Sequence, residues 1–133
     1  MSPASPPLKI VIVEDNPVLL DLLSGMLAGI PGLALVGHAD SEAAALDLLL
    51  DARPQLAIID LELRAGTGLG VLGALHERPA EFGEPRAVVF SIHAHPVVQS
   101  RCLTLGAVAF FDKSFQTDEL LEFVQRTAEN HPG

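Results

Sequence analysis

The sequence predicts a doubly wound α/β fold, in which a five-stranded parallel sheet carries helices on both faces. Short runs of apolar and β-branched residues alternate with longer segments whose apolar residues recur at helical spacing. A chain of 133 residues that is 49% hydrophobic has the size and composition of one domain with a substantial core. Because crossovers between parallel strands are right-handed, this alternation places helices on both faces of one sheet.

The expected strands are short and apolar, as strands buried on both faces are. They lie at residues 8–13, 33–37, 56–60, 87–91 and 108–111. The expected helices lie at residues 17–30, 41–51, about 68–76, about 96–105 and 117–128. For the first helix, Asn16 provides a cap, Pro17 suits the first turn, and Pro31-Gly32 is expected to end it.

The ends of the chain and its single cysteine set the expected organisation. Residues 1–7, rich in Pro and Ser, are expected to be disordered, residues 8–130 to form the domain, and residues 131–133 to form a tail. Cys102 has no partner for an internal disulfide, and its apolar neighbours predict a buried structural thiol. With no signal segment at the start and no apolar run of membrane-spanning length, a cytoplasmic location away from membranes is expected.

The charge balance argues against anionic partners. The chain has 17 acidic and 8 basic residues, which give a formal net charge of −9. Such a chain repels nucleic-acid phosphates and anionic membrane surfaces unless its basic residues cluster. They are scattered along the sequence, so no direct nucleic-acid binding is expected.

Polar side chains collect where the apolar strands end. Glu14 and Asp15 follow the first strand, Asp60 ends the third, Ser91 ends the fourth, and Lys113 follows the fifth. In doubly wound sheets the site lies beyond the carboxyl ends of the strands, near the point where the strand order reverses. These five side chains are therefore expected to meet at one edge of the sheet.

The chemistry of this set points to a metal ion and a phosphoryl group. Converging carboxylates suit Mg²⁺, a hard cation that prefers oxygen ligands. An Asp carboxylate can act as a nucleophile and form an aspartyl phosphate when a metal and a cation neutralise the phosphoryl charge. Lys113 is the obvious cation for that role.

The same residues resemble a known family signature. Glu14-Asp15, the segment from Ile58 to Leu63 around Asp60, Ser91, and Phe110-Phe111-Asp112-Lys113 are similar to the motifs of response-regulator receiver domains in two-component signal transduction. The resemblance covers roughly residues 8–130 and implies a flavodoxin-like (βα)5 fold. It also implies a phosphorelay phosphoprotein whose only chemistry is its own phosphorylation and dephosphorylation, not a metabolic enzyme.

By this resemblance, each residue has an expected role. Asp60 would accept the phosphoryl group, with Asp15 and Asp60 as direct Mg²⁺ ligands, Glu14 acting through water, and the main-chain carbonyl of Glu62 as a further ligand. Ser91 and Lys113 would contact the phosphoryl oxygens, and Phe110 would be the switch aromatic that moves with Ser91. The full set of expected site residues is Glu14, Asp15, Asp60, Glu62, Ser91, Phe110 and Lys113.

The resemblance also implies partners. The phosphoryl donor would be a sensor histidine kinase, a phosphotransfer protein or a small phosphodonor. The surface of the fourth helix, fifth strand and fifth helix would change on phosphorylation and contact partners or form a homodimer.

The chain departs from the family pattern at three places along the sequence. Ser114 stands where the family usually has a Pro in a cis bond, which leaves the geometry of the loop at Lys113 open. Ile92 replaces the usual small residue after Ser91 and could narrow access to the site. Arg64-Ala65 replaces a Pro-rich turn, and the glycine-rich stretch 66–70 is interpreted as the loop and helix start after Asp60, not as a nucleotide-binding loop.

Other hypotheses stay open at this stage. A degenerate receiver could serve as a phosphorylation-independent scaffold, and a Mg²⁺-dependent phosphohydrolase with an aspartyl-phosphate intermediate is a further alternative. Such phosphohydrolases usually have their nucleophile after the first strand and a second Asp two residues later, whereas Glu14 and Asp15 are adjacent. His93 and His95 lie near the expected site, but loop histidines are more often simple surface residues than ligands.

Overall fold

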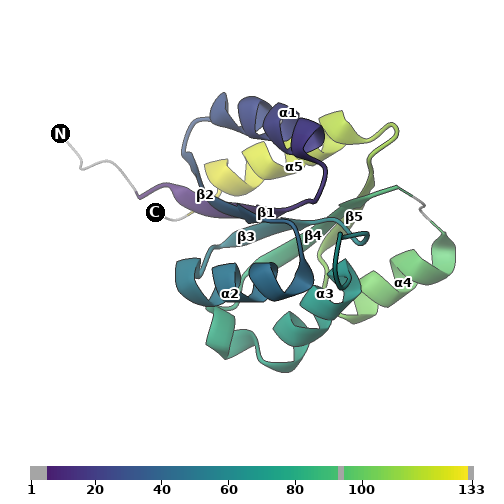
Figure 1. The fold of residues 1–133 in the computed structure, drawn as a ribbon. Coiled ribbons are helices and arrows are strands. Elements are labelled where there is room, and N and C mark those ends of the chain that lie inside the picture. Colours follow the sequence, from purple (N-terminus) through teal and green to yellow (C-terminus); the bar gives the residue numbers. More distant parts are fainter. Residues whose placement is uncertain (1–5, 93–94, 132–133) are drawn as a thin grey trace.

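The fold is a five-stranded parallel sheet between two layers of helices (Figure 1). The computed structural model describes residues 6–92 and 95–131. The sheet order is β2-β1-β3-β4-β5, and every pair of neighbouring strands is parallel. This confirms the predicted flavodoxin-like arrangement. The strands are β1 Leu8–Val13, β2 Leu33–Ala39, β3 Leu56–Ile59, β4 Arg86–Ser91 and β5 Ala109–Asp112.

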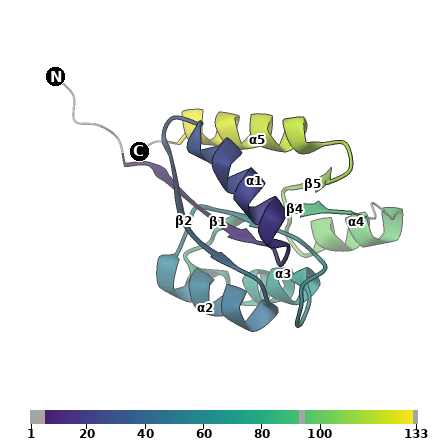
Figure 2. The same cartoon turned by 45° about the horizontal axis from the view of Figure 1, so that its top comes forward.

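The helices divide between the two faces of the sheet, as predicted. In Figures 1 and 2, α1 and α5 lie together on one face, and α2, α3 and α4 lie on the other. Each helix starts and ends within a few residues of its predicted bounds. The helices are α1 Pro17–Ala28, α2 Glu42–Ala52, α3 Gly68–Glu77, α4 Pro96–Thr104 and α5 Thr117–Glu129, with a short 3-10 helix, η1 Pro79–Phe82.

The core forms two layers because successive side chains of a strand point to opposite faces of the sheet. In β1, Val11 and Val13 belong to the layer beneath α2, α3 and α4, whereas Ile10 and Ile12 belong to the layer beneath α1 and α5. All four are buried. A strand buried on both faces needs a continuous apolar run, and β1 is apolar without interruption from Ile10 to Val13.

The two adjacent phenylalanines of β5 follow the same alternation. Phe110 packs against the layer beneath α2, α3 and α4, and Phe111 packs against the opposite layer. The ring of Phe111 lies 5.8 Å from that of Phe123 in α5, measured between centroids. Both side chains are partly buried and pack against the core on opposite faces of the sheet.

The first helix begins as predicted but ends earlier. The side chain of Asn16 accepts hydrogen bonds from the main-chain N–H groups of Val18 and Leu19, as a helix cap does. The prediction that the helix runs to residue 30, just before Pro31-Gly32, is wrong by two residues, since the helix stops at Ala28. The N–H of Gly29 donates to the carbonyl of Met26, so the chain leaves the helix through a tighter turn.

The sequence prediction missed η1, which follows α3. Phe82 in this turn is only 1% exposed and packs in the layer beneath α2 and α3. Arg53, the C-cap of α2, donates hydrogen bonds to the main-chain carbonyls of Ala80 and Glu81. This segment therefore closes one end of the core.

Two further expectations concern the single cysteine and membrane-spanning segments. Cys102 is fully buried, and burial raises the pKa of its thiol, as expected for a structural cysteine. Among the described helices, none combines the length and apolar character needed to cross a bilayer.

We expect Phe82→Ala to lower the free energy of unfolding by about 3–5 kcal/mol, because it removes a buried aromatic side chain from a packed layer. Phe115→Ala is the matched control, since Phe115 is 72% exposed, and it should cost less than about 0.5 kcal/mol. The chain has no Trp or Tyr, so urea unfolding is best followed by far-ultraviolet circular dichroism. Equal losses in the two variants would contradict the proposed role of η1.

Candidate functional site

The register of the sheet brings the predicted site residues together. Val13 pairs with Ile59, so Glu14 and Asp60 leave adjacent strands at the same level. The N–H of Asp60 donates to the carbonyl of Val13 at 2.9 Å, which extends this pairing by one residue. The strand order reverses at this point, because the chain passes from β1 outward to β2 and then back to β3 on the other side. The site thus lies where doubly wound sheets place theirs.

On the other side of Asp60, β4 and β5 supply the hydroxyl and the cation. Ser91 ends β4 and pairs with Asp112 of β5. The N–H of Lys113 donates to the carbonyl of Ser91 at 3.0 Å, which anchors the residue that follows β5. Four strands therefore fix the positions of the site residues.

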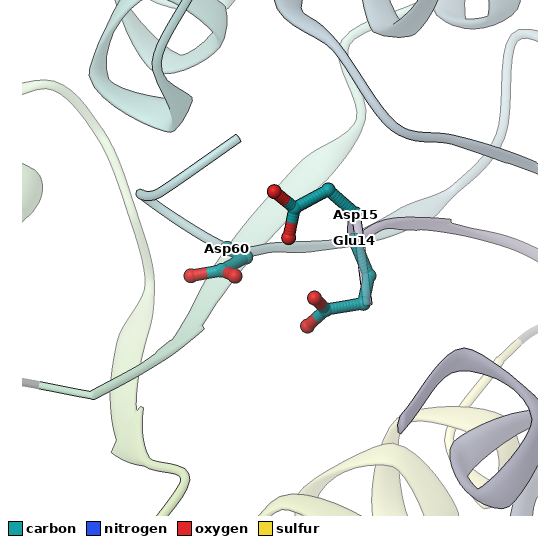
Figure 3. A group of neighbouring side chains, drawn as sticks. All are labelled: Glu14, Asp15 and Asp60. Atoms are coloured by element: carbon teal, nitrogen blue, oxygen red, sulfur yellow. The ribbon is translucent and has the colours of Figure 1, made fainter. Parts of the chain in front are cut away.

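Three carboxylates form one cluster at this edge (Figure 3). Each of Glu14, Asp15 and Asp60 offers an oxygen within 4.8 Å of the oxygens of the other two. Glu14 and Asp60 are buried, at 3% and 5% exposure, and Asp15 is exposed to solvent. The cluster is therefore open on one side.

Lys113 binds two members of this cluster. Its Nζ lies 2.5 Å from Oε1 of Glu14 and 2.7 Å from Oδ2 of Asp60. The lysine side chain is only 11% exposed, so these contacts are shielded from solvent.

The other oxygen of Asp60 is also occupied. Its Oδ1 accepts a hydrogen bond from Oγ of Ser91 at 2.9 Å and another from the N–H of Glu62 at 3.2 Å. Each carboxylate oxygen of Asp60 thus has a donor, and the side chain is held in one orientation.

Burial and pairing act in opposite directions on the charges of the site. Burial raises the pKa of the Glu14 carboxyl, although the ammonium of Lys113 and the N–H of Asn16 lower it. Burial also disfavours the charged form of Lys113, but its bonds to Asp60 and Glu14 outweigh this, and the pKa of Lys113 is raised. Because the pKa of Glu14 is raised above its usual 4.5, ionising this carboxyl costs more in the folded protein than in the unfolded chain. The free energy of unfolding therefore falls as pH rises from 4.5 through the raised pKa.

The donor set fits a hard divalent cation. All three candidate ligands are carboxylates, and one side of the cluster is open to water. Mg²⁺ prefers a few carboxylate oxygens and keeps several waters, so the residues present suit it. Among the described residues this group contains no His or Cys, which softer metals favour.

The loop after Asp60 is held close to the site. A side chain at Gly68 would place its Cβ 2.2 Å from the carbonyl oxygen of Asp60, so only glycine fits there. The N–H of Gly68 donates to the carbonyl of Leu61, and Glu62 forms an antiparallel bridge with Thr67. Helix α3 starts at Gly68 with Thr67 as its cap, which confirms the interpretation of the glycine-rich stretch as a loop and helix start.

The departures from the family pattern leave Lys113 in place. The described part of the chain has no cis peptide bond, so Ser114 follows Lys113 in the trans form. The N–H of Ser114 donates to Oδ1 of Asp112 at 2.7 Å, and Oε1 of Gln116 accepts from the N–H of Asp112. These polar contacts, which sequence reasoning missed, shape the turn.

The loop after β4 contains Ile92, His93 and His95, which the sequence places near the expected site. The side chain of Ile92, which follows Ser91, is 48% exposed. His93 lies outside the described residues. His95 caps α4, because its Nδ1 accepts from the N–H of Val97 at 3.3 Å, and it is not in the carboxylate cluster.

Comparison with known proteins identifies the family. The model of the response regulator receiver domain matches residues 10–125. The chain belongs to this family. The matched segment begins within β1, ends within α5 and includes the carboxylate cluster, so the receiver domain accounts for nearly the whole chain.

Curated proteins are similar to this chain over most of its length. The chain is 26% identical over 122 residues to the nitrate/nitrite response regulator protein NarL of Escherichia coli, and the alignment covers 92% of this chain and 55% of that protein. It is 30% identical over 126 residues to a protein-glutamate methylesterase/protein-glutamine glutaminase of Moorella thermoacetica, of which it covers 28%. The chain thus spans about half the length of such relatives, or less.

Solved structures show the same fold. The signal receiver domain of NarL from Mycobacterium tuberculosis superposes with a TM-score of 0.82 at 26% identity, over 96% of this chain and all of that one. The response regulator domain of CheB from Thermotoga maritima superposes with a TM-score of 0.81 over 95% of this chain and 99% of its own, and its 19% identity supports the fold alone.

We expect Lys113→Met to shift the titration of Glu14 to higher pH in metal-free buffer. The substitution removes both the hydrogen bond and the positive charge that lower the pKa of this buried carboxyl. The ¹³C shift of the Glu14 carboxyl, followed against pH, measures the change. Lys9→Met is the control, since Nζ of Lys9 binds the carbonyl of Ala52 and not the cluster. An unchanged Glu14 titration in Lys113→Met would contradict the assigned pairing.

Proposed function

We propose that this receiver domain is a phosphoacceptor switch that takes a phosphoryl group onto Asp60. The donor is a phosphohistidine of a sensor histidine kinase or phosphotransfer protein, or a small acyl phosphate. The observation that carries the proposal is the contact of Lys113 with Asp60 and Glu14 inside a carboxylate cluster. A cation beside a nucleophilic carboxylate is what phosphoryl transfer requires.

The metal roles follow from the donor set. Asp15 and Asp60 are proposed as direct ligands of Mg²⁺, Glu14 as a ligand through water, and the main-chain carbonyl of Glu62 as a further ligand. When bound, Mg²⁺ neutralises charge on the phosphoryl oxygens. The hydrogen bond from the N–H of Glu62 to Asp60 supports this placement, since it keeps the loop next to the carboxylate.

In the transfer, a carboxylate oxygen of Asp60 forms a bond to phosphorus as the bond from phosphorus to the donor's leaving group breaks. The leaving imidazole or carboxylate keeps the bonding electron pair, and Asp60 becomes an acyl phosphate. Lys113 and Ser91 already bond to the two oxygens of Asp60, so each can exchange that contact for one with a phosphoryl oxygen. After the transfer, these donors would stabilise the negative charge of the phosphoryl group instead of that of the Asp60 carboxylate.

The same exchange provides the switch. Ser91 and Lys113 are joined through the main chain at the ends of β4 and β5, and Phe110 lies on β5 beside Val89. Movement of Ser91 toward a phosphoryl group would shift the balance between two packings of Phe110 and of the surface of α4, β5 and α5. We propose that this surface binds partners or a second copy of the domain.

Exposed apolar side chains support that assignment. Val97 and Leu103 in α4 are 70% and 54% exposed, and Val108, directly before β5, is 50% exposed. With a net charge of −9, the chain is expected to meet proteins and not nucleic acid through this segment.

The scaffold and phosphohydrolase hypotheses have less support. A phosphorylation-independent scaffold needs neither a shielded lysine nor a filled set of donors around Asp60, yet both are present. A phosphohydrolase of the expected kind would have a second Asp two residues after the nucleophile that follows the first strand, whereas Glu14 and Asp15 are adjacent. We therefore propose self-phosphorylation and autodephosphorylation as the only reactions.

We expect the protein to form an acyl-phosphate adduct with acetyl phosphate and Mg²⁺, and Asp60→Asn to abolish it, because an amide is a poor nucleophile for this transfer. Intact-mass measurement detects the adduct. Asp21→Asn, the same chemical change at an exposed position of α1, is the control and should be modified like the wild type. No wild-type adduct, or an adduct that survives in Asp60→Asn, would overturn the assignment.

We also expect chelation of divalent ions with EDTA to prevent the reaction while leaving the fold intact. Lys113 already pairs with the buried carboxylates of Glu14 and Asp60, and the strands are joined through their main chains, so the metal is not needed to hold the sheet together. Far-ultraviolet circular dichroism monitors the fold, and intact mass monitors the adduct. Equal adduct formation with and without EDTA would remove Mg²⁺ from the proposal.

A further inference from the structure

The loop at residues 61–67, which follows Asp60, is fastened to the start of α2 by Glu42. Oε1 of Glu42 accepts a hydrogen bond from the N–H of Thr67 at 2.9 Å. The N–H of Glu42 donates to the carbonyl of Ala65 at 3.0 Å. The main chain and the side chain of Glu42 therefore each form a hydrogen bond with the loop. Helices α2 and α3 lie side by side on the same face of the sheet, which brings these segments together (Figure 1).

Two glycines make room for this side chain. A Cβ at Gly66 would lie 2.4 Å from Cβ of Glu42, and a Cβ at Gly70 would lie 2.1 Å from its Oε1. Gly66 also has φ +74°, a conformation that other residues rarely adopt. The Glu42 side chain thus occupies space that the sequence keeps empty of side chains.

The fastened loop reaches Asp60 through a short series of contacts. Thr67, which Glu42 holds, forms an antiparallel bridge with Glu62. The N–H of Glu62 in turn donates to Oδ1 of Asp60. Thr67 is therefore linked directly to Glu62, the residue whose main-chain carbonyl is a proposed metal ligand.

The composition of the loop explains why an external tether matters. At Arg64-Ala65 the chain lacks a proline, whose fixed φ would limit the loop's conformations. Arg64 does pair with Asp40 at 2.9 Å, but both side chains are about half exposed or more, and such a surface pair contributes little. Glu42 is the stronger link, because it is only partly exposed and bonds to the main chain.

We propose that Glu42 is a positioning residue of the Mg²⁺ site: by holding the loop after Asp60, it keeps the Glu62 carbonyl in place for the metal. The inference rests on the proposed function, since it takes the metal site from there. Glu42 itself does not ligate the ion, and its effect on Mg²⁺ affinity passes through Thr67 and Glu62.

The test compares Glu42→Ala with Glu42→Gln. Both variants remove the charge that favours the first turn of α2, but only Gln keeps an oxygen that can accept from Thr67. Asp47→Ala, at an exposed position of the same helix, is the control for a general loss of negative charge. Mg²⁺ alone is the probe, and calorimetric titration gives its dissociation constant.

For Glu42→Ala we expect the Mg²⁺ dissociation constant to rise about 3- to 10-fold, less than the roughly 10- to 100-fold typical of groups that bond to metal ligands directly. Glu42→Gln and Asp47→Ala should stay within about twofold of wild type. As a second readout, amide exchange at Thr67 in metal-free buffer should be about tenfold faster in Glu42→Ala only, the effect of losing one hydrogen bond to a charged acceptor.

The outcomes separate the inference from the proposed function. If the wild type does not bind Mg²⁺, the proposed metal site fails and the role of Glu42 falls with it. If the wild type binds and Glu42→Ala binds equally well, only the positioning role is overturned. If Glu42→Gln is weakened as much as Glu42→Ala, the effect is one of charge at a distance, and the tether is likewise rejected.

Discussion

The ammonium group of Lys113 lies between two buried carboxylates, and the arrangement of the whole carboxyl edge depends on this contact. Burying Glu14 and Asp60 without a counter-charge would cost several kcal/mol for each ion. When ionised, Glu14, Asp15 and Asp60 carry three negative charges against one positive charge from Lys113. The difference, −3 + 1 = −2, is the charge that one divalent cation neutralises. The net charge and the oxygen ligands of the cluster therefore both suit a hard divalent cation.

The parallel sheet makes this contact possible. Glu14 and Lys113 are far apart in the sequence, and only the alignment of β1, β3, β4 and β5 brings them to one edge. The main-chain bonds from Asp60 to Val13 and from Lys113 to Ser91 extend the sheet just beyond its strands. Such bonds fix the side chains more tightly than a free loop would. This matters for the phosphoryl transfer that we propose, because that reaction depends chiefly on positioned charges. The loop after Asp60 has less support from the sheet and relies instead on its contacts with α2.

Local patterns in the sequence were sufficient to predict most of the fold and the members of the cluster. Buried parallel strands read as apolar runs, and each run ends in a polar residue that the topology must place at the carboxyl edge, as for Asp60 and Ser91. Contacts that depend on three-dimensional proximity were not predictable in this way. The end of α1 at Ala28, the burial of Phe82 in η1 and the grip of Glu42 on Thr67 have no periodic signal. The glycines at 66 and 70 were visible, but the side chain for which they make room was not.

The most direct test of this account is a crystal structure of the protein with Mg²⁺ and beryllofluoride, which mimics an acyl phosphate. We expect the beryllium to be bonded to a carboxylate oxygen of Asp60, with Lys113 and Ser91 turned from that carboxylate to the fluorines. The metal should lie among the oxygens of Glu14, Asp15 and Asp60. Beryllofluoride absent from Asp60 under saturating conditions, with Lys113 still bound to both carboxylates, would contradict the account.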